Sequence, residues 1–278
     1  MVMAVCLSSG ALPAVAATTL HVPFRVDGDG RMVVDALLSG EAISAMVDTG
    51  LSVNLMLQPA AASRAGVRPL PFLKSGRSSG IDGMGDRGRL ALAKIVTLGG
   101  TPGDWDMPAV IQHTPILKHD AMLGMGFLDG YDVSIDFKMR RISLSKPAHG
   151  AASGGGFSNC APGKPSYSTS GRCGVDAVYV DTGARRTLVN SVMAAQLGLP
   201  ASGGEPTTIT GASGRTFPAR RYTGEVTIGG VTVSAVDVAD FPGRGGCKRT
   251  CAEAILGMDA LGRLSRLTIT RQRILLEP

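Results

Sequence analysis

Two copies of the tripeptide Asp-Thr-Gly stand far apart in the chain, at Asp48–Gly50 and Asp181–Gly183. Each copy ends an apolar run, as a buried strand entering a tight glycine turn would. Two carboxylates held close together cannot both ionise cheaply, so they share a proton and titrate as a pair. One can take a proton from a water that attacks an electrophilic carbon, and the other can protonate the group that leaves. This chemistry needs no metal and no cofactor, and we expect neither.

The surroundings of the tripeptide are repeated as well. Each copy is followed by a helix-like segment that closes on glycine, a strand that ends in Gly-Gly, and an apolar segment containing Leu-Gly-Met. In the first half these are 58–66, 96–100 and 122–128, and in the second half 191–198, 226–230 and 255–261. Leu123 follows Asp48 at the same distance along the chain as Leu256 follows Asp181. Repetition in this order indicates a duplicated lobe.

The repeat predicts how the chain is divided. We expect a signal peptide at 1–16, an N-terminal lobe at 17–146, a flexible Gly/Ser-rich linker at 147–171 and a C-terminal lobe at 172–278. Within each lobe, short apolar strands are broken by Gly, Asp, Ser and Pro, with only one or two helical stretches. This pattern predicts an all-β fold of two similar closed-barrel or sandwich lobes, with a short helix in each.

The repeated segments resemble the aspartic peptidases, specifically their retroviral-type lobe. That lobe has an apolar strand, Asp-Thr-Gly, a glycine-containing flap, and an apolar pair with glycine before a short helix. The matching parts here are Ala45–Gly50 with Ala121–Gly124, and Val178–Gly183 with Ala254–Gly257. The resemblance covers essentially the whole chain after residue 16. Two such lobes in one chain, as in the pepsin-like enzymes, imply that a monomer supplies both catalytic aspartates, Asp48 and Asp181.

The resemblance also implies roles for the residues around the two aspartates. The residues that support the active-site loops would be Thr49, Gly50, Ser52, Thr182 and Gly183. Two glycine-rich hairpins would act as flaps that cover the substrate and shield it from water. Their substrate-binding residues would be Ile81, Asp82 and Gly83 in the first lobe, and Ile209, Thr210 and Gly211 in the second.

One departure from the family leaves alternatives open. Arg185 stands where the family usually has a hydroxyl or acidic residue. A guanidinium there would favour the ionised form of the carboxylate pair, unless it points to solvent. A protease-like binding module without turnover is therefore one alternative. A serine hydrolase is the other, because Gly76–Gly80 fits Gly-x-Ser-x-Gly around Ser78, although glycine-rich sequence follows instead of a helix.

The net charge of +6 comes mostly from arginines of the second lobe. Five of them, Arg185, Arg186, Arg215, Arg220 and Arg221, flank its active-site and flap segments. A basic cleft wall would favour acidic peptide substrates, and a solvated basic face is the other interpretation. Nucleic-acid binding has little support, because the chain has no reader motif and only 4% aromatic residues.

The N-terminus and the cysteines indicate export. Residues 1–16 are apolar and end in Ala14-Val15-Ala16, a small-x-small cleavage pattern, although no positive segment precedes them. No apolar run reaches the length of a membrane span. Cys160, Cys173, Cys247 and Cys251 remain after cleavage, and we expect two disulfides and not a zinc site. Of the three possible pairings, Cys160–Cys173 with Cys247–Cys251 is favoured. A periplasmic or secreted location follows as the expectation.

Overall fold

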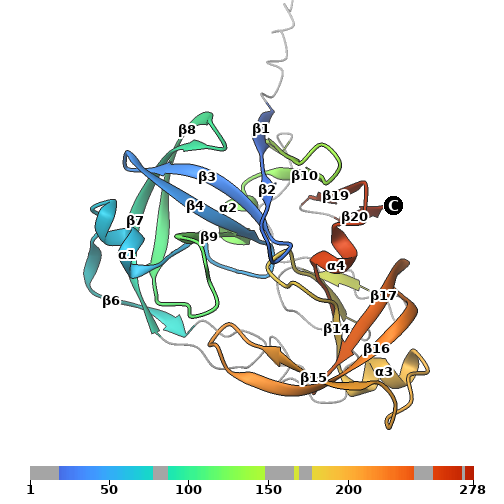
Figure 1. Ribbon diagram of the computed structural model, residues 1–278. Coiled ribbons are helices and arrows are strands. Elements are labelled where there is room, and N and C mark those ends of the chain that lie inside the picture. The colour runs from blue at the N-terminus through green and yellow to red at the C-terminus, as the bar shows by residue number, and fades with distance from the viewer. Residues whose placement is uncertain (1–18, 78–86, 148–165, 169–176, 241–252, 271–272) are drawn as a thin grey trace, which may run out of the picture.

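The computed structural model describes residues 19–77, 87–147, 166–168, 177–240, 253–270 and 273–278. In these ranges the chain is mostly β, arranged in three sheets with four short helices (Figure 1). Two sheets belong to one lobe each, and the third contains strands from both. This architecture confirms the predicted all-β fold class.

In the first lobe, eight strands form one sheet in the order β2-β3-β4-β9-β5-β8-β7-β6. A further pairing between β3 and β7 closes six of these strands into a barrel. The elements are β2 (Arg25–Val26), β3 (Met32–Leu38), β4 (Glu41–Asp48), β5 (Leu55–Leu57), α1 (Pro59–Arg64), β6 (Pro69–Arg77), β7 (Arg87–Leu98), β8 (Thr101–Ile111), β9 (Ala121–Gly124) and α2 (Met125–Leu128). Asp48 thus stands at the end of a barrel strand.

In the second lobe, seven strands form a sheet in the order β12-β13-β18-β14-β17-β16-β15. The elements are β12 (Ser166–Ser168), β13 (Ala177–Val180), β14 (Leu188–Val189), α3 (Ser191–Gln196), β15 (Glu205–Thr210), β16 (Thr216–Ile228), β17 (Val231–Val238), β18 (Glu253–Leu256) and α4 (Met258–Leu261). Among the described strands, no pairing closes this sheet as β3 and β7 close the first. β12 lies inside the range expected to be linker and pairs in parallel with β13.

The Gly-Gly signals mark hairpin turns in both lobes. Gly99 and Gly100 join β7 to β8, and Gly229 and Gly230 join β16 to β17. All four have positive φ, between 57° and 85°, a backbone conformation that residues with a Cβ rarely adopt. The flanking strands then pair in register, Leu98 with Thr101 and Ile228 with Val231. Glycine at these positions therefore sets the register of each hairpin.

A five-stranded sheet joins the two lobes. Its order is β1-β11-β10-β19-β20, where β1 (Leu20–Pro23), β10 (Asp132–Asp136) and β11 (Arg141–Ser145) belong to the first lobe, and β19 (Arg266–Ile269) and β20 (Ile274–Glu277) to the second. β10 and β19 pair antiparallel, with Ile135 opposite Leu267. Both side chains are fully buried in a hydrophobic core that runs through both lobes. The lobes are therefore held together by backbone hydrogen bonds as well as apolar contact.

The two expectations that indicate export fall outside the described residues. These are the signal peptide at 1–16 and the disulfides of Cys160, Cys173, Cys247 and Cys251, so export and the cysteine pairing remain predictions. Of the helices that the structure describes, none has the length and apolar character needed to cross a bilayer.

An ion-pair network connects α1 to the strands on which Asp48 depends. Asp120, just before β9, accepts hydrogen bonds from Arg64 Nη2 (2.8 Å) and from the backbone N–H of Ser44 in β4 (3.0 Å), while Arg64 Nε donates to Glu41 (2.9 Å). Burial would raise the pKa of Asp120, but the hydrogen bonds from Arg64 and Ser44 outweigh it and hold the pKa below its ordinary value. Arg64 and Ser44 thus bind the ionised carboxylate of Asp120 more tightly than its protonated form.

We expect Asp120→Asn to lower the free energy of unfolding at neutral pH by about 1 kcal/mol, because it weakens a charge-assisted hydrogen bond. Since an unfolded aspartate titrates near pH 4, the contribution of Asp120 is complete above that pH and is lost as the pH falls through its lower folded-state pKa. Denaturant unfolding at several pH values should therefore show a flatter acid dependence in Asp120→Asn than in the wild type. Asp35→Asn, which removes a carboxylate that is 75% exposed, is the matched control. An equal flattening in both variants would contradict this account.

Candidate active site

Each Asp-Thr-Gly follows a strand that is paired with the Leu-Gly strand of its own lobe. Asp48 ends β4 and stands opposite Gly124 of the parallel strand β9. Asp181 follows β13, whose last residue, Val180, stands opposite Leu256 of the parallel strand β18. The backbone N–H of Asp181 donates to Leu256 O at 3.1 Å. The duplicated apolar segments therefore fix the backbone at both aspartates in the same way.

The two threonines exchange hydrogen bonds across the lobe boundary. Thr49 N–H donates to Thr182 Oγ1 (3.0 Å), and Thr182 N–H donates to Thr49 Oγ1 (3.0 Å). Each hydroxyl then donates to the backbone oxygen just before the opposite tripeptide, at Val180 and Val47 (both 2.8 Å). Both threonine side chains are fully buried. These four hydrogen bonds, related by the internal repeat, bring two tripeptides that lie 133 residues apart in the chain into contact.

Each aspartate carboxylate lies against the glycine of the other tripeptide. A Cβ placed at Gly50 would lie 2.7 Å from Asp181 Oδ1, and one at Gly183 would lie 2.7 Å from Asp48 Oδ1. Within its own loop, Asp48 Oδ1 accepts from Gly50 N–H (2.8 Å), and Asp181 Oδ1 accepts from Gly183 N–H (3.0 Å). Glycine is needed in both loops because real Cβ atoms do not approach other atoms this closely. Asp181 is 4% exposed, and Asp48 is partly buried.

The glycine of each Leu-Gly segment supports the loop after the tripeptide. A Cβ at Gly124 would lie 2.6 Å from Leu51 O, and one at Gly257 would lie 2.5 Å from Arg186 O. The next residues hold the loops directly, since Met125 N–H donates to Leu51 O (2.7 Å) and Met258 N–H to Ala184 O (2.8 Å). The repeated Leu-Gly-Met pattern therefore has a structural reason, which is close backbone packing beneath each tripeptide.

The flap residues of the second lobe form a hairpin that reaches the first lobe. Ile209 and Thr210, at the end of β15, pair with β16, and Gly211 N–H donates to Arg215 O (2.8 Å) across the turn. At that turn Gly214 lies against Pro115, which follows β8 in the first lobe; a Cβ at Gly214 would be 3.2 Å from Pro115 Cβ. The hairpin thus spans the lobe boundary.

Other predicted site residues are only partly accounted for. Ile81, Asp82, Gly83 and the alternative nucleophile Ser78 lie outside the described residues, between the paired strands β6 and β7. Ser52 is exposed. Sequence reasoning missed the contact between Pro115 and Gly214, because proline and glycine in loops gave no signal beyond a turn.

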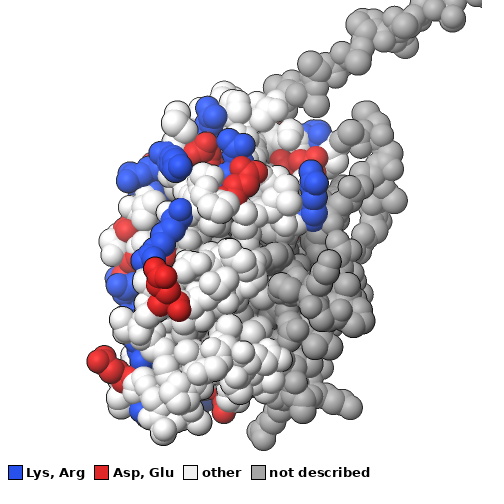
Figure 2. Space-filling model, turned by 90° about the vertical axis from the view of Figure 1, so that its right-hand side faces the viewer, with Lys and Arg blue, Asp and Glu red and all other residues white. Residues whose placement is uncertain are grey.

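Four of the five arginines that flank the active-site and flap segments of the second lobe fall into two groups. Arg221 makes a two-point contact with the fully buried Asp237 (2.8 and 2.9 Å), and Arg186 lies 3.5 Å from the same carboxylate. Arg220 donates to the backbone oxygens of 202–204. These three thus have internal partners, whereas the Arg185 side chain is 57% exposed. On the face drawn in Figure 2, basic and acidic side chains are interspersed.

We expect Thr182→Val to lower the free energy of unfolding by about 2 to 4 kcal/mol. The substitution keeps the shape of the side chain but leaves Thr49 N–H and Val47 O, both buried, without the Thr182 hydroxyl. Thr182→Ser, which keeps the hydroxyl, should cost about 1 kcal/mol, in line with the loss of one methyl group. Thermal and denaturant unfolding of the three proteins measure both effects. Equal losses for valine and serine would show that packing, not the exchanged hydrogen bonds, holds the loops.

Among the comparisons with known proteins, one family match covers most of the second lobe. Residues 172–260 match the family described as aspartyl protease. The structure of a retropepsin-like aspartic protease from Rickettsia conorii is similar to this chain at 19% sequence identity and a TM-score of 0.37, over 49% of this chain and 100% of that one. No curated protein matches the chain significantly. The segment that carries Asp181–Gly183 and Ala254–Gly257 therefore has the sequence pattern of the aspartyl proteases, as the resemblance predicted.

Proposed function

We propose that the chain is an aspartic endopeptidase in which Asp48 and Asp181 form one catalytic dyad. The observation that carries the proposal is the reciprocal packing of each carboxylate against the glycine of the opposite tripeptide. The exchanged threonine hydrogen bonds support it, because they hold the two aspartate loops in one fixed relation. A preorganised pair of carboxylates is what general acid and base catalysis on one water requires.

Hydrogen bonds within each loop hold both carboxylates in place for this chemistry. Gly50 N–H and Gly183 N–H donate to the Oδ1 atoms of Asp48 and Asp181, and Ala184 N–H also donates to Asp181 Oδ1 (3.1 Å). In a pair that shares one proton, one carboxylate is ionised and the other is protonated. The ionised carboxylate accepts a proton from the attacking water, while the protonated one donates to the carbonyl oxygen.

The test is digestion of a peptide library across the acidic and neutral pH range, with and without a statine-type transition-state analogue. We expect cleavage that the analogue blocks and that falls at alkaline pH, once both carboxylates are ionised. Cleavage that resists the analogue but yields to a serine-directed phosphonate would favour the Ser78 alternative. Tight binding of peptides without cleavage would favour the binding module.

A further inference from the structure

The Arg185 side chain begins beside the proposed catalytic group. Ala184, the preceding residue, donates its N–H to Asp181 Oδ1 (3.1 Å) and accepts from Met258 N–H (2.8 Å). The backbone oxygen of Arg185 itself accepts from Asp259 N–H (3.2 Å). Hydrogen bonds thus hold the backbone of Ala184 and Arg185, from which the side chain extends. Ala184 also contacts the Asp181 carboxylate.

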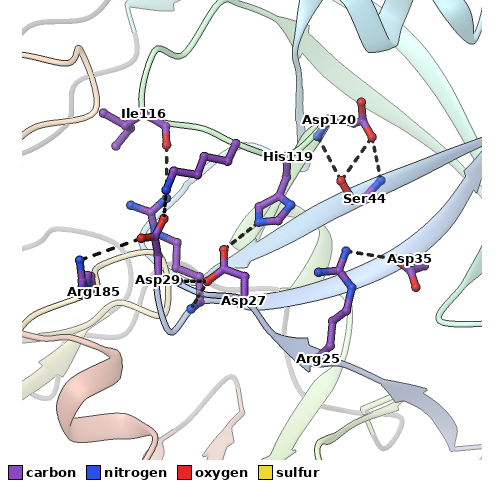
Figure 3. Close-up of polar contacts among 11 residues, drawn as sticks. Arg25, Asp27, Asp29, Asp35, Ser44, Ile116, His119, Asp120 and Arg185 are labelled. Carbon is purple, nitrogen blue, oxygen red and sulfur yellow. Dashed lines mark hydrogen bonds and ion pairs between the residues drawn. The ribbon is translucent and has the colours of Figure 1, made fainter.

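The guanidinium of Arg185 crosses to the first lobe, where it has a weak partner. Its Nη1 atom lies 4.0 Å from Asp29 Oδ1, in the turn between β2 and β3 (Figure 3). The other oxygen of Asp29 is 2.8 Å from Lys118 Nζ. A hydrogen bond from Lys118 is the main reason why the pKa of Asp29 lies below its ordinary value, and nearby Arg31 adds to it. Asp29 is therefore held more closely by Lys118 than by Arg185, whose guanidinium remains accessible to another anion.

The Asp29 turn is itself held firmly on the first lobe. Asp27 Oδ1 accepts from the backbone N–H groups of Asp29 and Arg31 (both 2.9 Å), and Asp27 Oδ2 lies 2.8 Å from His119 Nε2. Arg31 Nη1 also donates to Ile116 O (3.3 Å). These contacts do not involve the second lobe, so the position of Asp29 does not depend on its contact with Arg185.

We propose that Arg185 is a specificity-determining residue that binds a carboxylate side chain of the peptide substrate close to the scissile bond. The enzyme would then prefer peptides with Asp or Glu near the cleaved bond over the same peptides with Asn or Gln. This inference rests on the proposed peptidase function. Arg185 differs in this respect from three other arginines of the second lobe. Arg186 and Arg221 contact the Asp237 carboxylate, and Arg220 donates to a backbone oxygen.

The test uses pairs of peptides that differ only in Asp against Asn, or Glu against Gln, built on a sequence that the library digestion shows to be cleaved. We expect a kcat/KM ratio of about five in favour of the acidic peptide, as for a partly exposed ion pair, and a smaller ratio at high salt. In Arg185→Gln the ratio should fall to about one, whereas Arg273→Gln, which removes the same charge from the β19–β20 hairpin, should keep the wild-type ratio.

Asp29→Asn separates this role from a purely structural contact between the lobes. If Asp29 competes with the substrate for Arg185, Asp29→Asn should raise the acidic preference above that of the wild type, opposite in sign to Arg185→Gln. If the Arg185–Asp29 contact only holds the two lobes together, Arg185→Gln and Asp29→Asn should both lower the cleavage of acidic and neutral peptides to the same extent. That result would overturn the proposal. A wild-type ratio of one also overturns it. Absence of any cleavage by the wild type would instead contradict the proposed function.

Discussion

Asp181→Asn is expected to reduce kcat for peptide hydrolysis by about 10³-fold or more, and Asp48→Asn by a similar factor. Asparagine keeps the shape of the side chain and an oxygen that can accept from Gly183 N–H or Gly50 N–H, but it cannot exchange the proton. Each variant should therefore keep a thermal midpoint close to that of the wild type. Kinetics on a peptide from the library digestion and thermal unfolding measure the two effects.

Ser78→Ala is the control for this experiment, and its activity should stay near the wild-type value. Full activity in Asp181→Asn would show that the second lobe does not supply half of the dyad. Loss of activity in Ser78→Ala, with both aspartate variants active, would support the serine alternative.

Gly50→Ala and Gly183→Ala are expected to reduce kcat/KM by about 10²-fold or more, since small misplacements of catalytic groups are costly. The added methyl group would meet the carboxylate of the opposite lobe, Asp181 for Gly50 and Asp48 for Gly183. It must push either the carboxylate or the loop away, and the threonine hydrogen bonds resist movement of the loop. Steady-state kinetics with the same peptide provide the measurement.

Gly28→Ala is a matched control, because a Cβ at Gly28 would meet nothing within 4 Å and its φ is not positive. We expect Gly28→Ala to be near neutral for both activity and stability. If Gly50→Ala or Gly183→Ala were equally neutral, the carboxylates would not lie where we place the dyad.

The features that depend on local sequence could be predicted. The Gly-Gly pairs at 99–100 and 229–230 form hairpin turns because positive φ requires glycine there. The helix-like segments contain α1 and α3, with Gly66 and Gly198 at positive φ just after them. The two tripeptides have equivalent backbone settings, as the repeat suggests, because β4 and β13 have equivalent partners in β9 and β18.

The features that depend on contacts between the halves could not be predicted. β10 and β19 alternate apolar and polar residues like any strand, and nothing in their sequences says that they pair with each other. Asp237 is fully buried, and its charge gave no sign that Arg221 would meet it from the neighbouring strand. The partner of Arg185 was likewise hidden, because Asp29 lies more than 150 residues away in the chain.

The most direct test of the central claim, that one chain supplies both aspartates, is to mix the two inactive variants. In a dyad formed within one chain, every molecule of Asp48→Asn or Asp181→Asn lacks one carboxylate, so the mixture should be as inactive as either variant alone. The wild-type rate should correspondingly be proportional to protein concentration. Recovery of activity on mixing, or a rate that rises with the square of the concentration, would contradict the claim and show that two chains share the site.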